Sequence, residues 1–109
     1  MVNNLLSTNP TSDKPANKLI RVHVYIQGYV QGVGFRFMIM QKAKELGVYG
    51  FIRHVPNSVN QLEAVFQGNK NYVEDMVAYC RTGPDSAKVD VIEVQSELPE
   101  EIDQEFVIM

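Results

Sequence analysis

Hydrophobic and polar positions alternate along residues 18–27, KLIRVHVYIQ, and this pattern is typical of a strand that is buried on one face. The segments 48–54, 61–68 and 87–95 predict three further strands, and the short apolar segment 105–109 predicts a fifth. Turn-forming residues in the sequence VPNSVN separate the second strand from the third, so we expect these two to form a hairpin.

Two segments have the hydrophobic period of an amphipathic helix. Residues 35–46 form the first, and Gly47 is a natural stop for it. Residues 69–83 form the second, which either Asn69 or Asn71 could cap. The resulting order, βαββαβ, predicts an α+β fold of the ferredoxin-like, split βαβ type, with two helices on one face of an antiparallel sheet.

Length and composition set limits on the kind of protein. The chain has 109 residues, of which 45% are hydrophobic and 21% charged, as in one small globular domain. Residues 1–17 are rich in Asn, Ser, Thr and Pro, so we expect a disordered N-terminal tail before a single domain of residues 18–109. The chain shows neither a secretion signal nor an apolar run near the roughly 20 residues of a membrane helix. A single cysteine, Cys80, excludes an internal disulfide and is expected to be a buried thiol. We therefore expect a cytoplasmic monomer that does not bind membranes.

Charge is distributed unevenly along the chain. The net charge of −3 argues against general nucleic-acid binding. However, residues 14–44 contain six basic residues and no acidic residue. This bias makes one region of the protein attractive to a small anion.

The nonapeptide GYVQGVGFR, residues 28–36, is the most unusual stretch. A helix begins with N–H groups that have no partner inside the helix, and a Ser, Thr, Asp or Asn cap usually satisfies some of them. This stretch offers no such cap, and its glycines allow close approach of a ligand. Arg36 stands at the positive end of the helix dipole, which is unfavourable by about 0.3–1 kcal/mol unless it contacts an anion. Residues 28–36 therefore predict an anion site, although a tight turn followed by a solvated arginine would also fit.

The segments GYVQGVGFR (28–36) and LGVYGFIRH (46–54) resemble the acylphosphatase family, in the order and at the spacing of its two motifs. The likeness covers residues 19–109. It implies hydrolysis of acyl phosphates to a carboxylate and inorganic phosphate, with no metal, no cofactor and no phosphoenzyme. In the family, the backbone N–H groups of one loop hold the phosphoryl oxygens and the arginine that follows pairs with the same group. The phosphate-binding residues carried over to this chain are Gln31, Gly32, Val33, Gly34, Phe35 and Arg36.

One position departs from the family pattern. His54 stands where the resemblance leads us to expect an asparagine that orients the attacking water. A neutral imidazole also has one donor and one acceptor, whereas an imidazolium has two donors. We therefore expect His54 to act with Arg36 in catalysis, less well than asparagine and only while neutral. Because the nearby Arg36 should lower its pKa, activity should fall as the pH is lowered through the titration of His54.

Neighbouring residues have simpler interpretations. The turn of residues 55–60 is longer than the family form and lacks its glycine, and either Asn57 or Asn60 could adopt a left-handed conformation instead. His23 and Arg53 alternate with inward-facing strand residues, so we expect both on the solvent-facing side of the sheet.

Other functions remain open at this stage. A catalytically weak or inactive phosphate-binding or regulatory small-molecule-binding module could have the same fold. An RNA-recognition domain has the same element order, but its aromatic motif lies on the third strand. Here the similar segment opens the first helix, and the third strand contains one aromatic residue and an acidic one.

Overall fold

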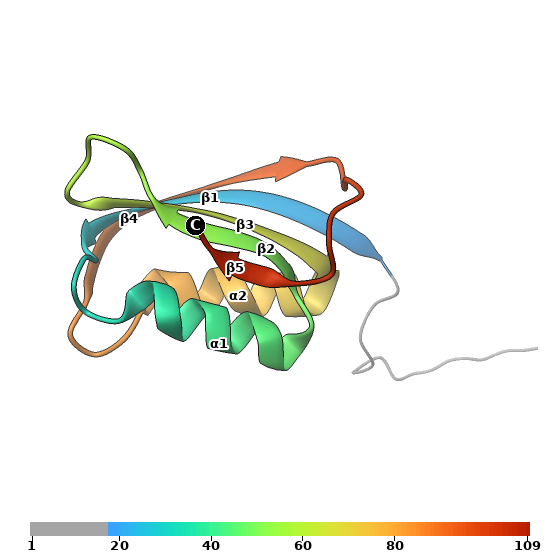
Figure 1. Cartoon of the computed structure of the whole chain (residues 1–109), viewed down its shortest axis with the longest axis horizontal. Coiled ribbons are helices and arrows are strands. Elements are labelled where there is room, and N and C mark those ends of the chain that lie inside the picture. Colours follow the sequence, from blue (N-terminus) through green and yellow to red (C-terminus); the bar gives the residue numbers. More distant parts are fainter. Residues whose placement is uncertain (1–17) are drawn as a thin grey trace, which may run out of the picture.

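The protein is described by a computed structural model that covers residues 18–109. Its elements follow the predicted order (Figure 1). They are β1 (Leu19–Tyr29), α1 (Phe35–Leu46), β2 (Tyr49–His54), β3 (Gln61–Asn69), α2 (Lys70–Thr82), β4 (Lys88–Glu97) and β5 (Phe106–Ile108). The predicted disordered tail, residues 1–17, lies outside the described residues. Among the described helices, none is long and apolar enough to cross a membrane.

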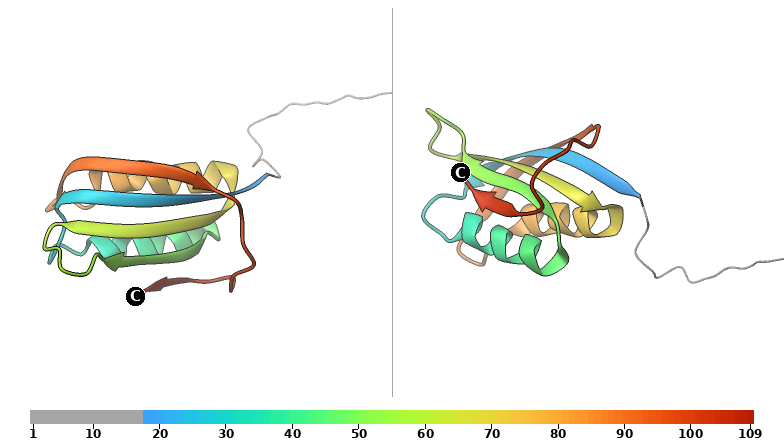
Figure 2. Two further views of the ribbon diagram at one scale, coloured as in Figure 1. Left: turned by 90° about the horizontal axis from the view of Figure 1, so that it is seen from above. Right: turned by 45° about the vertical axis from the view of Figure 1, so that its right-hand side comes forward.

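The five strands form one sheet in the order β4-β1-β3-β2-β5. Both helices cover the same face of the sheet, as expected, and the other face stays open (Figure 2). The sheet is antiparallel, as expected, except at one edge, where β5 pairs with β2 in parallel. This follows from the chain path: β4 and β5 lie at opposite edges, so the segment 98–105 must cross the end of the sheet before β5 begins.

The core lies between the sheet and the helices. Alternate residues of β1 and β3 and the inner stripe of each helix are almost completely buried there, as the hydrophobic periods predict. These residues include Val22, Val24, Ile26, Leu62, Ala64, Phe66, Phe35, Ile39, Ala43, Val73, Met76 and Cys80. Burial raises the pKa of the Cys80 thiol, which therefore stays protonated and unreactive, as the sequence suggested. The side chain of Asn69, not that of Asn71, caps α2, accepting a hydrogen bond from the Asn71 N–H.

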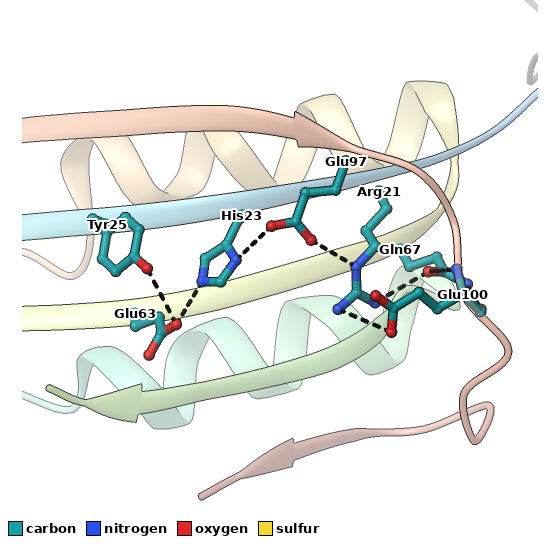
Figure 3. Close-up of polar contacts among 7 residues, drawn as sticks. All are labelled: Arg21, His23, Tyr25, Glu63, Gln67, Glu97 and Glu100. Atoms are coloured by element: carbon teal, nitrogen blue, oxygen red, sulfur yellow. Dashed lines mark hydrogen bonds and ion pairs between the residues drawn. The ribbon is translucent and has the colours of Figure 1, made fainter.

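The open face of the sheet carries a polar network centred on His23 (Figure 3). Nδ1 of His23 lies 2.8 Å from a carboxylate oxygen of Glu97, and Nε2 lies 2.5 Å from a carboxylate oxygen of Glu63. Arg21 donates to Glu97 at 3.0 Å, and Arg53 donates to Glu63 at 2.7 Å. His23 and Arg53 thus lie on the expected face, but both take part in ion pairs. The burial of Glu63, of which only 7% is exposed, was not predicted.

The network shifts the pKa values of its members in opposite directions. Burial alone would lower the pKa of His23, but the hydrogen bonds and charges of Glu63 and Glu97 outweigh it and raise this pKa. Burial alone would raise the pKa of Glu63, but hydrogen bonds from His23 and Arg53 outweigh it and lower this pKa. The hydrogen bonds from Arg21 and then His23 lower the pKa of Glu97. The two carboxylates therefore favour the imidazolium form of His23, in which each ring nitrogen donates to one of them.

The same network fixes the start of the crossing segment. The side-chain amide of Gln67 donates to the backbone carbonyl of Glu100 at 2.7 Å, and its oxygen accepts from the Glu100 N–H at 3.0 Å. Arg21 also contacts the side chains of Gln67 and Glu100 (Figure 3). Hydrogen bonds and ion pairs on the open face therefore join β1, β3 and β4 to the segment that leads to β5.

The contribution of His23 to stability should depend on pH. Because its folded-state pKa is raised, this contribution is complete below the unfolded value of about 6.5 and disappears as the pH rises through the folded pKa. Because the pKa values of Glu63 and Glu97 are lowered, their contribution is lost as the pH falls through those values. We predict that His23→Gln lowers the free energy of unfolding by about 1–3 kcal/mol near pH 5.5, measured by urea denaturation.

The difference between this variant and the unmodified protein should shrink as the pH rises through the raised folded-state pKa of His23, because the ring then becomes neutral in the folded state. A difference that stays constant from acidic to alkaline pH would show that the charge of His23 does not stabilise the fold.

Candidate functional site

The loop between β1 and α1 leaves the beginning of the helix without a cap. Gly34 is the N-cap residue of α1, has a left-handed φ of 78°, and offers no side chain. The first turn contains no acidic residue. The backbone N–H groups of residues 31–36 make no hydrogen bond to any other part of residues 18–109. The donors that the sequence led us to expect are therefore free in the described structure.

The conformation of this loop is typical of backbone anion sites. Gly32 and Gly34 both have positive φ, 69° and 78°, whereas Val33 between them does not. In other proteins, alternation of left-handed and right-handed residues can turn successive N–H groups toward one side of the chain, as in a concave anion-binding nest. A Cβ atom built on either glycine meets no described atom within 4 Å, so the space beside both of them is open.

Contacts from two other connections hold the loop in place. The side-chain amide of Gln31 donates to the carbonyl of Ser58 at 3.3 Å, which joins the loop to the β2–β3 turn. On the other side, the Ser86 hydroxyl donates to the carbonyl of Val33 at 3.4 Å, from the α2–β4 connection. All three connections lie at the same end of the molecule, at the left in Figure 1. In the turn, Asn57 and not Asn60 has the positive φ, 63°, that the missing glycine would have supplied.

The ends of the loop are anchored by buried residues. Phe35, 1% exposed, inserts its ring so close to Gly83 that a Cβ at Gly83 would lie 2.3 Å from it. Before the loop, the N–H of Gly28 donates to the carbonyl of Asn60 at 2.9 Å. A Cβ at Gly28 would lie 2.1 Å from the backbone carbonyl oxygen of Lys88, so the strand can bend here only with glycine.

Arg36 and His54 are brought together from different elements. Arg36 lies in the first turn of α1, is half-buried, and forms no ion pair with any carboxylate of residues 18–109. His54 is the last residue of β2 and lies two positions after the buried Ile52. Because side chains alternate along a strand, the side chain of His54 is on the helix-covered face of the sheet, and that of Arg53 is on the other face. Burial, and then the guanidinium of Arg36, lower the pKa of His54 below its usual value. The two residues therefore lie within electrostatic range of each other, as the sequence predicted.

The Nδ1 atom of His54 is the one buried side-chain polar atom of residues 18–109 that has no hydrogen-bond partner. Sequence reasoning could not foresee this, because the atom's surroundings depend on how β2 packs against the helices. Within the same residues, no group of three or more His, Cys, Asp and Glu side chains is placed to hold a metal ion. His23, the other histidine, lies on the open face of the sheet and contributes nothing to this site.

Comparison with known proteins adds an independent finding. A family model described as "Acylphosphatase" matches residues 22–108. A protein named acylphosphatase from Trichormus variabilis is 45% identical over 86 residues, which cover 79% of this chain and 83% of the relative. The solved structure of an acylphosphatase from Bacillus subtilis has a TM-score of 0.76 and 24% identity, and the match covers 83% of this chain and 98% of that one. An acylphosphatase structure from Coxiella burnetii has a TM-score of 0.77 and 23% identity, covering 90% and 100%.

The geometry of Gly28 leads to a prediction about stability. We expect Gly28→Ala to lower the free energy of unfolding by more than about 2 kcal/mol, because both a positive φ and a backbone clash oppose the new Cβ. Gly47→Ala is the matched control, since Gly47 has a φ of 68° in open space and should cost only about 1 kcal/mol. Urea denaturation of both variants measures the difference, and equal losses would mean that the contact with Lys88 does not constrain the strand.

Proposed function

The chain belongs to the acylphosphatase family, and we propose that it hydrolyses acyl phosphates at the site formed by the β1–α1 loop, Arg36 and His54. The observation that carries this proposal is the uncapped start of α1, whose free N–H groups lie beside an arginine that has no carboxylate partner. The products are a carboxylate and inorganic phosphate.

The loop binds the phosphoryl group. The N–H groups of residues 31–36 donate to its oxygens, and the positive end of the helix dipole favours the negative charge. Arg36 adds charge-assisted hydrogen bonds worth about 1.5–3 kcal/mol each, more than the roughly 0.3–1 kcal/mol that its position in the first turn costs. Because the guanidinium forms no ion pair with a carboxylate of residues 18–109, it is available to the substrate.

Hydrolysis then requires little from the protein besides position and charge. Water attacks the phosphorus atom while the bond between phosphorus and the acyl oxygen breaks, and the electron pair leaves with the carboxylate. Because a carboxylate is a good leaving group, no strong general acid is needed. His54 orients the water, and its location within electrostatic range of Arg36 supports this role.

A catalytically weak phosphate-binding module is the alternative function, and the presence of His54 at this position is the observation that favours it. Such a protein would bind phosphate at the same loop but turn over acyl phosphate poorly. We further propose that the protein acts as a monomer in the cytoplasm, on acyl phosphate and inorganic phosphate, without a metal and without nucleic acid. The ion pairs across the open sheet face and the buried thiol of Cys80 support this description.

Arg36→Ala tests the site assignment. We expect the variant to lose at least about 10²–10³-fold in the steady-state hydrolysis of benzoyl phosphate, because a preorganised charge contact to the transition state is removed. Inorganic phosphate should inhibit the unmodified protein competitively and should no longer bind to the variant.

Lys44→Ala is the matched control, since it removes one positive charge from the other end of the same helix. It should leave hydrolysis unchanged. Normal turnover by Arg36→Ala would show that the reaction takes place elsewhere, and phosphate binding without turnover by the unmodified protein would favour the alternative function.

The pH dependence of kcat/KM should report the titration of His54. Because burial and Arg36 lower its pKa, the loss of activity on acidification should be centred below the usual value of about 6.5. We predict that His54→Asn removes this acidic limb, since an amide does not titrate, and raises the rate at neutral pH by up to about 10²-fold. A profile of the unmodified protein that stays flat down to about pH 4 would contradict a role for neutral His54.

A further inference from the structure

We propose that His54 presents an Nε2–H donor to the reacting groups, while its Nδ1 keeps the lone pair in the protein interior. The assignment of this hydrogen follows from the folded structure alone, whereas its use in hydrolysis rests on the proposed function. With its hydrogen on Nε2, His54 can donate a hydrogen bond, but it cannot accept the proton of the attacking water.

The location of the hydrogen follows from the surroundings of Nδ1. A neutral imidazole carries one N–H, either on Nδ1 or on Nε2. In this structure Nδ1 is buried and has no partner within residues 18–109. An N–H in that position would lose its hydrogen bond to water without gaining another, and orphaned buried N–H groups are rarer than under-satisfied acceptors. The hydrogen therefore belongs on Nε2.

The charged group beside His54 strengthens this assignment. Among residues 18–109, Arg36 is the one charged residue that lowers the pKa of His54, after burial, and its guanidinium has donors but no acceptor. It cannot accept a hydrogen bond from Nδ1. It also opposes a second proton, because protonation would place a buried N–H and a positive charge next to an existing positive charge.

The consequence for hydrolysis concerns the direction of hydrogen bonding. An Nε2–H group can hold a water molecule by one of its lone pairs, or it can donate to an oxygen of the phosphoryl group. Either contact positions the reactants. The proton that water releases must pass to a phosphoryl oxygen or to solvent, because the ring has no free lone pair on the side of the site.

His23 provides a reference within the same molecule. The chain contains only two histidines. Both ring nitrogens of His23 contact carboxylates, of Glu97 and Glu63, so both carry hydrogen. Near pH 6.5, the reference pKa, the two residues should therefore differ in charge as well as in the location of their hydrogens.

Long-range ¹H–¹⁵N NMR spectra of the full ¹⁵N-labelled chain test the assignment without any substrate. His54→Asn removes one set of ring signals and so identifies the other as His23. We expect one protonated nitrogen, Nε2, and one unprotonated nitrogen, Nδ1, for His54, against two protonated nitrogens for His23. A ring of His54 that carries its hydrogen on Nδ1, or that is charged near pH 6.5, overturns the proposal.

Titration with inorganic phosphate then tests the orientation of the donor. The amide signals of residues 31–36 and the Nε2–H signal of His54 should shift together, while the ring signals of His23 stay in place. If the loop amides shift and His54 does not, the donor does not face the phosphate and the proposal fails, although the phosphate site stands. If the loop amides do not respond, the proposed function fails, and the spectrum without phosphate still decides where the hydrogen lies.

Discussion

A helix that starts without a cap has backbone N–H groups that lack hydrogen-bond acceptors. This constraint determines the structure of the loop before α1 and of the connections that contact it. The start of α1 offers free N–H groups, left-handed glycines at positions 32 and 34, and no acidic residue. In an ordinary helix a Ser or Asp side chain would satisfy these groups and would also occupy the space in front of them. Here the donors stay available because the loop is held from outside, by Ser58 and Ser86, and not by a cap of its own.

The arrangement of charge follows the two faces of the sheet. On the open face, the carboxylates of Glu63 and Glu97 are paired with Arg53, Arg21 and His23. On the helix face, Arg36 has no such partner within the described residues. Because opposite charges attract over several ångströms, a carboxylate near the loop would compete with a phosphate for both the guanidinium and the N–H groups. With Glu63 and Glu97 paired on the far side of the sheet, Arg36 keeps an uncompensated positive charge beside the loop, although the whole chain carries a net charge of −3.

The hydrophobic periods of the sequence were sufficient to predict most of the helices and strands. They did not predict the contacts between segments that are distant in the chain. Three features depend only on residues that are neighbours in the chain: the alternation of hydrophobic and polar residues in β1, the apolar stripe of α1, and the glycines that leave the start of α1 without a cap. By contrast, the partners of His23 lie 40 and 74 positions away, so its ion pairs depend on strand register, which hydrophobic periodicity does not specify. The parallel pairing of β5 and the contact of Gln31 with Ser58 were missed for the same reason. The same difference holds within the site. An anion contact for Arg36 was predictable from its position in the first turn of its own helix, whereas a role for His54 was predicted only from the family resemblance.

The two histidines show how one residue type acquires opposite properties within a single small domain. His23 lies between two carboxylates, and their charges outweigh the cost of burying an imidazolium. His54 lies beside a guanidinium, with a buried nitrogen that has no acceptor, and both features oppose a positive charge. An asparagine in place of His54 would keep the same charge at every pH, whereas protonation of His54 would add an N–H at its buried Nδ1 and a positive charge beside Arg36. Burial is the larger cause of the lowered pKa of His54, and the guanidinium that makes the loop attractive to a phosphoryl group lowers this pKa further, so anion binding and the protonation state of this residue share one physical cause.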